Sequence, residues 1–216
     1  MNKTLIKSFF GLAMLSAMSM ASAITFSASG VGGAIPDNGL FASTGSYSGL
    51  AGSITGITSV RVTMTTTHTW VGDLIARVEY GGLRFTLFQR TGTSGAGWSD
   101  DLLAGQYVFD TVSTNTIDSW ATGNVNVPGG TYRAAHQTNE LNIAGAAPNS
   151  VMSDGNVWNG LDPNGTYTMT FSDHAGGDVG AYGQWTVEGT YNAVPEPATM
   201  AALGLGVAAL LRRRKK

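Results

Sequence analysis

The stretch 59-SVRVTMTTTHTWVGDLIARVEYGGLRFTLF-88 decides the fold class of this 216-residue chain. Apolar residues take every second position near its two ends, first at Val60, Val62 and Met64 and then at Leu83, Phe85 and Leu87. This period of two places one set of side chains in a core and the other toward solvent, as in a β-strand. Gly81–Gly82 lies between two such runs, which predicts a two-residue hairpin.

The same alternation recurs later, over residues 166–171 and 184–188. Weaker patterns predict short strands at Gln106–Thr111 and Thr131–Ala134, while Thr114–Asn159 is mostly typical of long loops. The body therefore reads as an all-β sandwich of about eight strands in two sheets. The side chains expected in its core are Val60, Val62, Leu74, Phe85, Leu87, Tyr167, Met169, Phe171, Trp185 and Val187.

The charge of the chain is divided between its ends and its body. Residues 24–193 hold 13 acidic residues, five arginines and no lysine, a balance of −8, while the other cations lie in the two ends. An acidic body argues against nucleic acid and anionic lipid surfaces, which need cationic patches. The sequence has no cysteine, which excludes disulfides, thiol catalysis and cysteine-bound metals.

The N-terminal segment has the order of a secretory signal peptide. Lys3 and Lys7 precede an apolar run, and the small residues Ala21–Ser22–Ala23 offer a cleavage site. We expect residues 1–23 to be removed, which leaves a β-sandwich domain at residues 24–193 that begins with Ile24.

The C-terminal segment, residues 194–216, has three parts: Val-Pro-Glu-Pro, an apolar run and a cationic end. The run from Ala198 to Leu211 would make about 21 Å of helix, shorter than the ~30 Å core of a bilayer. Proline disfavours a helix interior, so the helix should begin at or just after Pro197. Cationic flanks favour the cytoplasmic side, so the body would lie on the opposite, non-cytoplasmic side of the inner membrane.

This three-part order resembles the bacterial PEP-CTERM sorting signal. The residues that carry the likeness are Val194, Pro195, Glu196, Pro197, Arg212, Arg213 and Arg214. The resemblance implies a short transmembrane helix that pauses in the membrane, a sorting enzyme of the exosortase type, and export to the cell surface or an extracellular polysaccharide matrix. A degenerate tail anchor is the alternative.

Two stretches of the body resemble the P domain (P/Homo B) that follows the catalytic domain of proprotein convertases. The first holds the residues His68, Thr69, Trp70, Gly72, Asp73 and Leu74, downstream of "IPDNG" at residues 35–39. The second holds Asn164, Gly165, Thr166, Asp173, Gly177, Asp178, Gly180 and Trp185. The resemblance implies a jelly-roll β-sandwich that acts beside a protease.

The sequence favours a domain without catalytic activity. The residues around Ser94 lack the order of a nucleophile elbow, and no pair of carboxylates is singled out for glycoside hydrolysis. His68, at a strand end, is expected to make a structural hydrogen bond, and a metal role for His174 is the less favoured interpretation.

Three functions remain open for such a domain. The first is an exported interaction or structural domain with a protein or exopolysaccharide partner. The second is a carbohydrate-binding module in which Trp98, Trp120 and Trp158 stack on sugar rings, unless these side chains pack onto the sandwich. The third is an accessory domain for a separate protease.

One structural calcium ion is the only cofactor that the sequence suggests. Several acids fall in turn-like sequence, and Asp37, Asp100 and Asp101 are the expected ligands. Calcium takes oxygen ligands from such irregular acidic loops, although aspartate is also a common turn residue.

Overall fold

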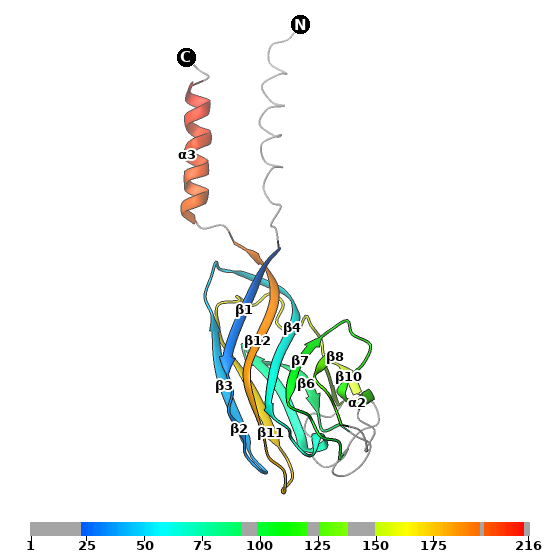
Figure 1. The fold of residues 1–216 in the computed structure, drawn as a ribbon. Helices are drawn as coiled ribbons and strands as arrows, with labels where there is room; N and C mark the ends of the chain where they lie inside the picture. The colour runs from blue at the N-terminus through cyan, green and yellow to red at the C-terminus, as the bar shows by residue number, and fades with distance from the viewer. Residues whose placement is uncertain (1–22, 92–98, 121–125, 138–149, 195–196, 214–216) are drawn as a thin grey trace.

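The computed structural model describes residues 23–91, 99–120, 126–137, 150–194 and 197–213 (Figure 1). The predicted signal peptide lies outside these residues, apart from Ala23. The strands are β1 (Ala23–Val31), β2 (Ala34–Ile35), β3 (Leu40–Tyr47), β4 (Gly52–Thr66), β5 (Leu74–Tyr80), β6 (Leu83–Gln89), β7 (Gly105–Asp110), β8 (Gly130–Arg133), β9 (Ala135–Gln137), β10 (Ser150–Met152), β11 (Gly165–Asp173) and β12 (Gly180–Ala193). The helical segments are η1 (Val71–Asp73), α2 (Ile117–Trp120) and α3 (Pro197–Arg213).

Most of these strands belong to one ten-stranded sheet. Its order is β6-β5-β11-β3-β1-β12-β4-β7-β8, with β2 paired to β12, and β9 and β10 form a separate pair. Neighbours in this sheet are antiparallel except β7 and β8, which run parallel. The all-β prediction is confirmed. The expected arrangement of about eight strands in two sheets was wrong, because hydrogen bonding runs without a break from β6 to β8.

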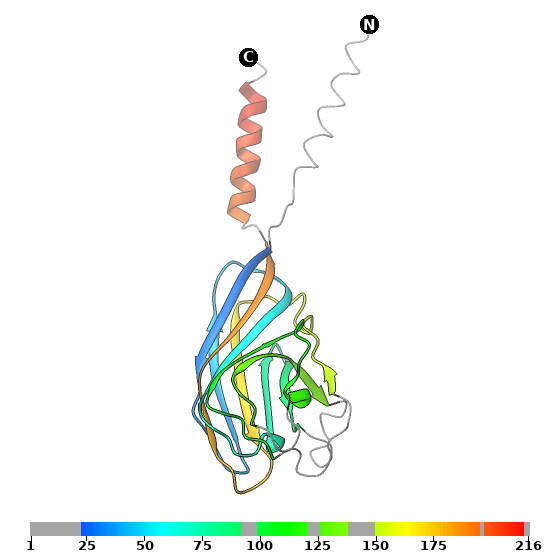
Figure 2. The ribbon, with the colours of Figure 1, turned by 45° about the vertical axis from the view of Figure 1, so that its right-hand side comes forward.

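The sheet curls until its two ends approach each other (Figure 2). β9 follows β8 after a single residue and packs against β6, the strand at the opposite end of the order. A strongly curled sheet covers its apolar inner face with itself, so the outer face can remain polar.

The core lies inside this curled sheet. All ten side chains that the alternation placed there are buried, with exposed fractions of at most 1 %. Aromatic rings fill much of the space: Tyr80 stacks on Tyr167 at 4.1 Å between centroids, and Phe171 stacks on Tyr182 at 4.5 Å. Burial of each such side chain stabilises the fold by roughly 1.5–3 kcal/mol.

The predicted hairpin is present between β5 and β6. Gly81 and Gly82 both have positive φ, 57° and 78°, which is the backbone of a type I′ turn. The weaker predictions, Gln106–Thr111 and Thr131–Ala134, correspond within one residue to β7 and β8.

The topology brings both ends of the body to one side. β1 and β12 are antiparallel neighbours, with Ala23 opposite Asn192, and α3 extends from this side away from the sheet (Figure 1). The loops at the other side hold the first of the two motifs that suggested a P domain and the 173–180 part of the second, whereas Asn164 lies on the tail side, where its Oδ1 accepts the N–H of Gly49.

Candidate functional site

The sorting segment is tied to the body at its first residue. The backbone N–H of Val194 donates to the carbonyl of Ala51 at 2.8 Å, and the Val194 side chain is exposed. Pro195, Glu196 and Arg214 lie outside the described residues. Helix α3 starts at Pro197, as predicted, and Arg212 and Arg213 occupy its last turn.

Helix α3 is apolar and open to its surroundings. Leu203, Leu205, Leu210 and Leu211 are each more than half exposed. Its 17 residues span about 25 Å. Within the described ranges, no helix is long and apolar enough to cross a membrane, so the structure does not show the predicted transmembrane helix.

The two P-domain-like motifs meet at the opposite end of the body. The first motif supplies His68, which follows β4 and is fully buried, and the second supplies Asp173, the last residue of β11. His68 Nε2 lies 3.4 Å from Asp173 Oδ2. Its Nδ1 accepts the backbone N–H of Trp70 at 3.3 Å, so Nε2 carries the proton and faces the carboxylate. The predicted structural hydrogen bond of His68 is confirmed.

Further hydrogen bonds hold the loops of this end together. The backbone N–H of Gly177 donates to Asp37 Oδ1 at 2.9 Å, and the Thr69 hydroxyl donates to the Asp178 carboxylate. Position 177 favours glycine because the backbone φ there is 115°, which other residues rarely adopt. The segments 35–39, 68–74 and 173–180 are therefore one packed unit, although they are far apart in sequence.

A buried carboxylate and a buried arginine complete this cluster. Asp73 Oδ1 lies 3.6 Å from an amino nitrogen of Arg90, whose Nε donates to the Gly72 carbonyl at 3.2 Å. Burial raises the pKa of Asp73 to about 6; Arg90 lowers it, whereas Asp173 and Asp178 add to the rise. Such a perturbed carboxyl marks a functional candidate, although structural charge networks produce the same effect.

A serine and a histidine also lie close together here. Ser172 Oγ is 2.9 Å from His174 Nε2, and burial, helped by Arg90, lowers the pKa of His174. An uncharged histidine beside a serine is a nucleophile–base arrangement in principle. Ser172 is only 6 % exposed, so its hydroxyl has little access to a substrate. The cluster therefore favours a structural role.

The predicted calcium ligands do not form one cluster with a third acidic or histidine side chain among the described residues. Asp37 accepts the Gly177 N–H, while Asp100 is buried and its carbonyl accepts the N–H of Val71. The carbonyl of Asp101 accepts the N–H of Val127. In the part of the chain that the structure describes, no three His, Asp or Glu side chains gather as a metal site would need. Asp37, Asp100 and Asp101 thus form no ready-made site, and calcium binding stays a prediction.

The three tryptophans proposed for sugar stacking have different surroundings. Trp158 is fully buried against Tyr80, Phe85 and Tyr167, so the stacking prediction was wrong for this residue. Trp120, in α2, is 42 % exposed and stays available. Trp98 lies outside the described residues.

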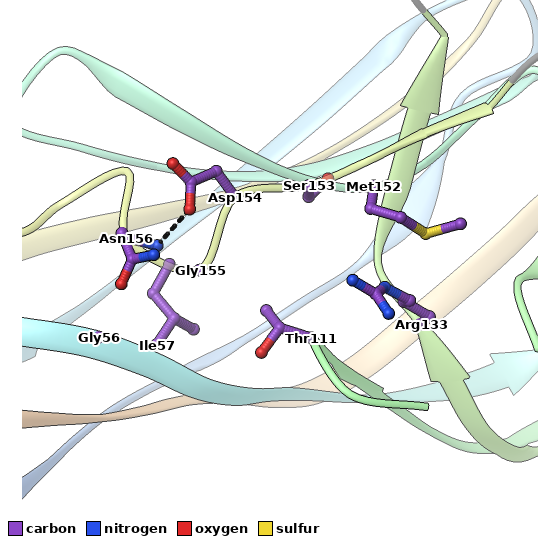
Figure 3. A pocket seen from close by; sticks show the side chains of 9 residues that line it. All are labelled: Gly56, Ile57, Thr111, Arg133, Met152, Ser153, Asp154, Gly155 and Asn156. Carbon is purple, nitrogen blue, oxygen red and sulfur yellow. Dashed lines mark hydrogen bonds between the residues drawn. The ribbon is translucent and has the colours of Figure 1, made fainter. Parts of the chain in front are cut away.

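A polar pocket lies beside β4 (Figure 3), on the half of that strand that begins opposite Ala193. Its volume is about 430 Å³. It is lined by Gly56, Ile57, Thr111, Arg133, Met152, Ser153, Asp154, Gly155 and Asn156. The Ile57 N–H donates to the Gly155 carbonyl at 2.8 Å, which fixes the segment after β10 against β4.

Sequence reasoning missed this pocket. Its walls come from four separate segments, and six of its nine lining residues lie in the stretch that looked like long loops. The one available signal was Arg133, an isolated cation in an acidic body, within a predicted strand.

Comparison with known families identifies the tail. Residues 193–215 match the PEP-CTERM protein-sorting motif. The match implies that the protein is exported and processed at the membrane by an exosortase. It does not extend to the β-body, and no curated protein and no solved structure matches the chain.

Proposed function

We propose that the body is a non-catalytic interaction or structural domain that the tail delivers to the cell surface or to an extracellular polysaccharide matrix. The observation that carries this proposal is the position of the sorting motif. The sorting motif follows β12 directly at one end of the body, and the rest of the domain lies on the other side of that end, away from the motif (Figure 1).

In this proposal a signal peptide at residues 1–23 starts export, and α3 pauses in the membrane with its cationic end in the cytoplasm. The exposed leucines of α3 need an apolar partner, which a bilayer or a membrane enzyme provides. The body then faces the periplasm before its release.

We further propose that the body is P-domain-like, with a jelly-roll-like fold most of whose strands form one continuous sheet in place of two. The support is the convergence of both motifs on the buried pair of His68 and Asp173. Gly180 fits the same pattern, since a Cβ at this position would lie 2.9 Å from His68 Cδ2. An accessory role toward a separate protease is the function that this likeness would add.

Fractionation of the native host tests the delivery. The protein should reach the extracellular fraction in cells that have the exosortase, and accumulate in the membrane fraction when the exosortase gene is deleted. A variant with Pro195, Glu196 and Pro197 changed to alanine should behave like the deletion. Changing Pro163 to alanine, in the body, is the matched control. Equal release in all strains would refute the proposal.

A further inference from the structure

Arg133 is a cation of the body whose charge is not balanced by the chain itself. Among the five body arginines, three have carboxylate partners: Arg77 and Arg84 both contact Glu79, and Arg90 contacts Asp73. Arg133 has no carboxylate partner among the described residues. The Nε of Arg133 is closed off from solvent and has no hydrogen-bond acceptor among the described residues. Leaving such a charged donor unsatisfied costs stability.

The nearby acids are engaged elsewhere. Asp110 is the register partner of Arg133, but its carboxylate accepts the N–H groups of Val112 and Ser113 and the Ser113 hydroxyl. Asp154, which lines the pocket, accepts the N–H of Asn156 at 2.8 Å (Figure 3). Among the described residues, no carboxylate therefore pairs with Arg133, and its guanidinium remains available at the pocket that it lines.

The remaining walls offer a different chemistry. Figure 3 shows Arg133 on one side of the pocket and Asp154 with Asn156 on the opposite side, with Thr111 and Ile57 between them. The exposed part of Met152 adds an apolar surface beside Arg133. The volume, about 430 Å³, lies in the range of small-molecule sites.

We propose that this pocket binds a saccharide that carries a carboxylate, a uronic acid unit. Arg133 holds the carboxylate through its planar fork of donors. Asp154, Asn156 and Thr111 exchange hydrogen bonds with the ring hydroxyls, and Met152 covers the C–H face of the ring. The proposal deepens the matrix-interaction role above and rests on it for where the ligand is met.

A saccharide fits better than a small inorganic anion. Asp154 and a body balance of −8 repel a bare anion, whereas the hydroxyl groups of a saccharide can donate to the carboxylate opposite Arg133. A neutral sugar would offer Arg133 only hydroxyl oxygens, without the charge and the bidentate geometry of a carboxylate. The ligand therefore needs both groups.

Calorimetric titration of the purified exported protein tests this assignment. The probes are trigalacturonate, the neutral galactose trimer with the same linkage, and sulfate. We expect binding of trigalacturonate at millimolar concentration or below, and at least about ten-fold weaker binding of the other two. Equal binding of the neutral trimer or of sulfate would overturn the proposal, and so would the absence of trigalacturonate binding.

Variants locate the site. Arg133→Gln should weaken trigalacturonate binding at least about ten-fold, and Arg133→Lys should weaken it less, because the charge remains while the fork is lost. Arg84→Gln removes the same charge at an exposed ion pair with Glu79 and should bind like the wild type. A melting curve checks that each variant is folded. Unchanged binding in a folded Arg133→Gln variant would overturn the assignment.

The two proposals fail separately. Titration uses purified protein, so a negative result removes the saccharide site and leaves the delivery untouched. Equal release from all strains in the fractionation removes the delivery and leaves a measured affinity in place.

Discussion

Substitution of Gly180 by alanine probes the junction at which the two motifs meet. A Cβ at this position would lie 2.9 Å from Cδ2 and 3.0 Å from Cβ of His68, closer than normal packing allows. His68 cannot easily move away, because its backbone N–H and carbonyl both pair with Leu102, at 2.9 and 2.8 Å. Its ring is fixed between the Trp70 N–H and Asp173.

The cost follows from this geometry. Overpacking in a well-packed interior typically costs about 1–3 kcal/mol. For a domain of this size, each kcal/mol lowers the melting temperature by about 2–4 °C, so Gly180→Ala should melt about 2–12 °C below the wild type. Thermal unfolding followed by far-ultraviolet circular dichroism measures the shift.

Gly176→Ala is the matched control. Its Cβ would meet only Asp37 Oδ1, at 3.8 Å, which is an ordinary contact. The loss of backbone freedom in the unfolded chain is the same in both variants. Gly176→Ala should therefore melt at or slightly above the wild-type temperature. A Gly180→Ala variant as stable as Gly176→Ala would refute the packing of Gly180 against His68.

Other variants and conditions test the core, the buried carboxylate and the predicted ion. Trp185 is fully buried, and its indole N–H donates to Ser43 Oγ at 2.8 Å. Trp185→Ala should therefore lower the free energy of unfolding by about 3–5 kcal/mol in urea titrations. Trp120→Ala should change this free energy by no more than about 0.5 kcal/mol. Burial raises the pKa of Asp73 from 3.8 to about 6, so the folded protein holds this proton more tightly than the unfolded chain and loses stability as the pH rises from about 4 to about 6. Relative to the wild type, Asp73→Asn should gain stability over that window, and a pH-independent difference in melting temperature would contradict this. His174 is present in both proteins, so its titration does not account for the difference. For calcium, the melting temperature should be higher with millimolar calcium than with chelator, and equal temperatures would exclude the site.

The strands and the core could be predicted from sequence because their signal is local. Alternation at Val60–Met64 and Tyr167–Phe171 marks the buried face without reference to any partner strand. The double glycine at Gly81–Gly82 fixes its own turn through positive φ. The start of α3 at Pro197 is equally local, since proline limits the backbone on its own.

Features that depend on distant segments could not be predicted. Trp158 stands alone in polar sequence, yet it is buried because segment 154–161 runs beside β4, with hydrogen bonds from Ile54 to Leu161 and from Ile57 to Gly155. The pocket around Arg133 depends on the same placement. The approach of the two ends of the sheet depends on the parallel pairing of β7 with β8, which no local sequence pattern predicts.

The mass of the exported protein tests the central claim most directly. Intact mass spectrometry of material from the extracellular fraction should give a chain that begins at Ile24 and lacks the cationic end from Arg212 onward. The same measurement on an exosortase-deleted strain should give the intact tail in the membrane fraction. Extracellular protein that retains the tail in the presence of the exosortase would contradict the claim.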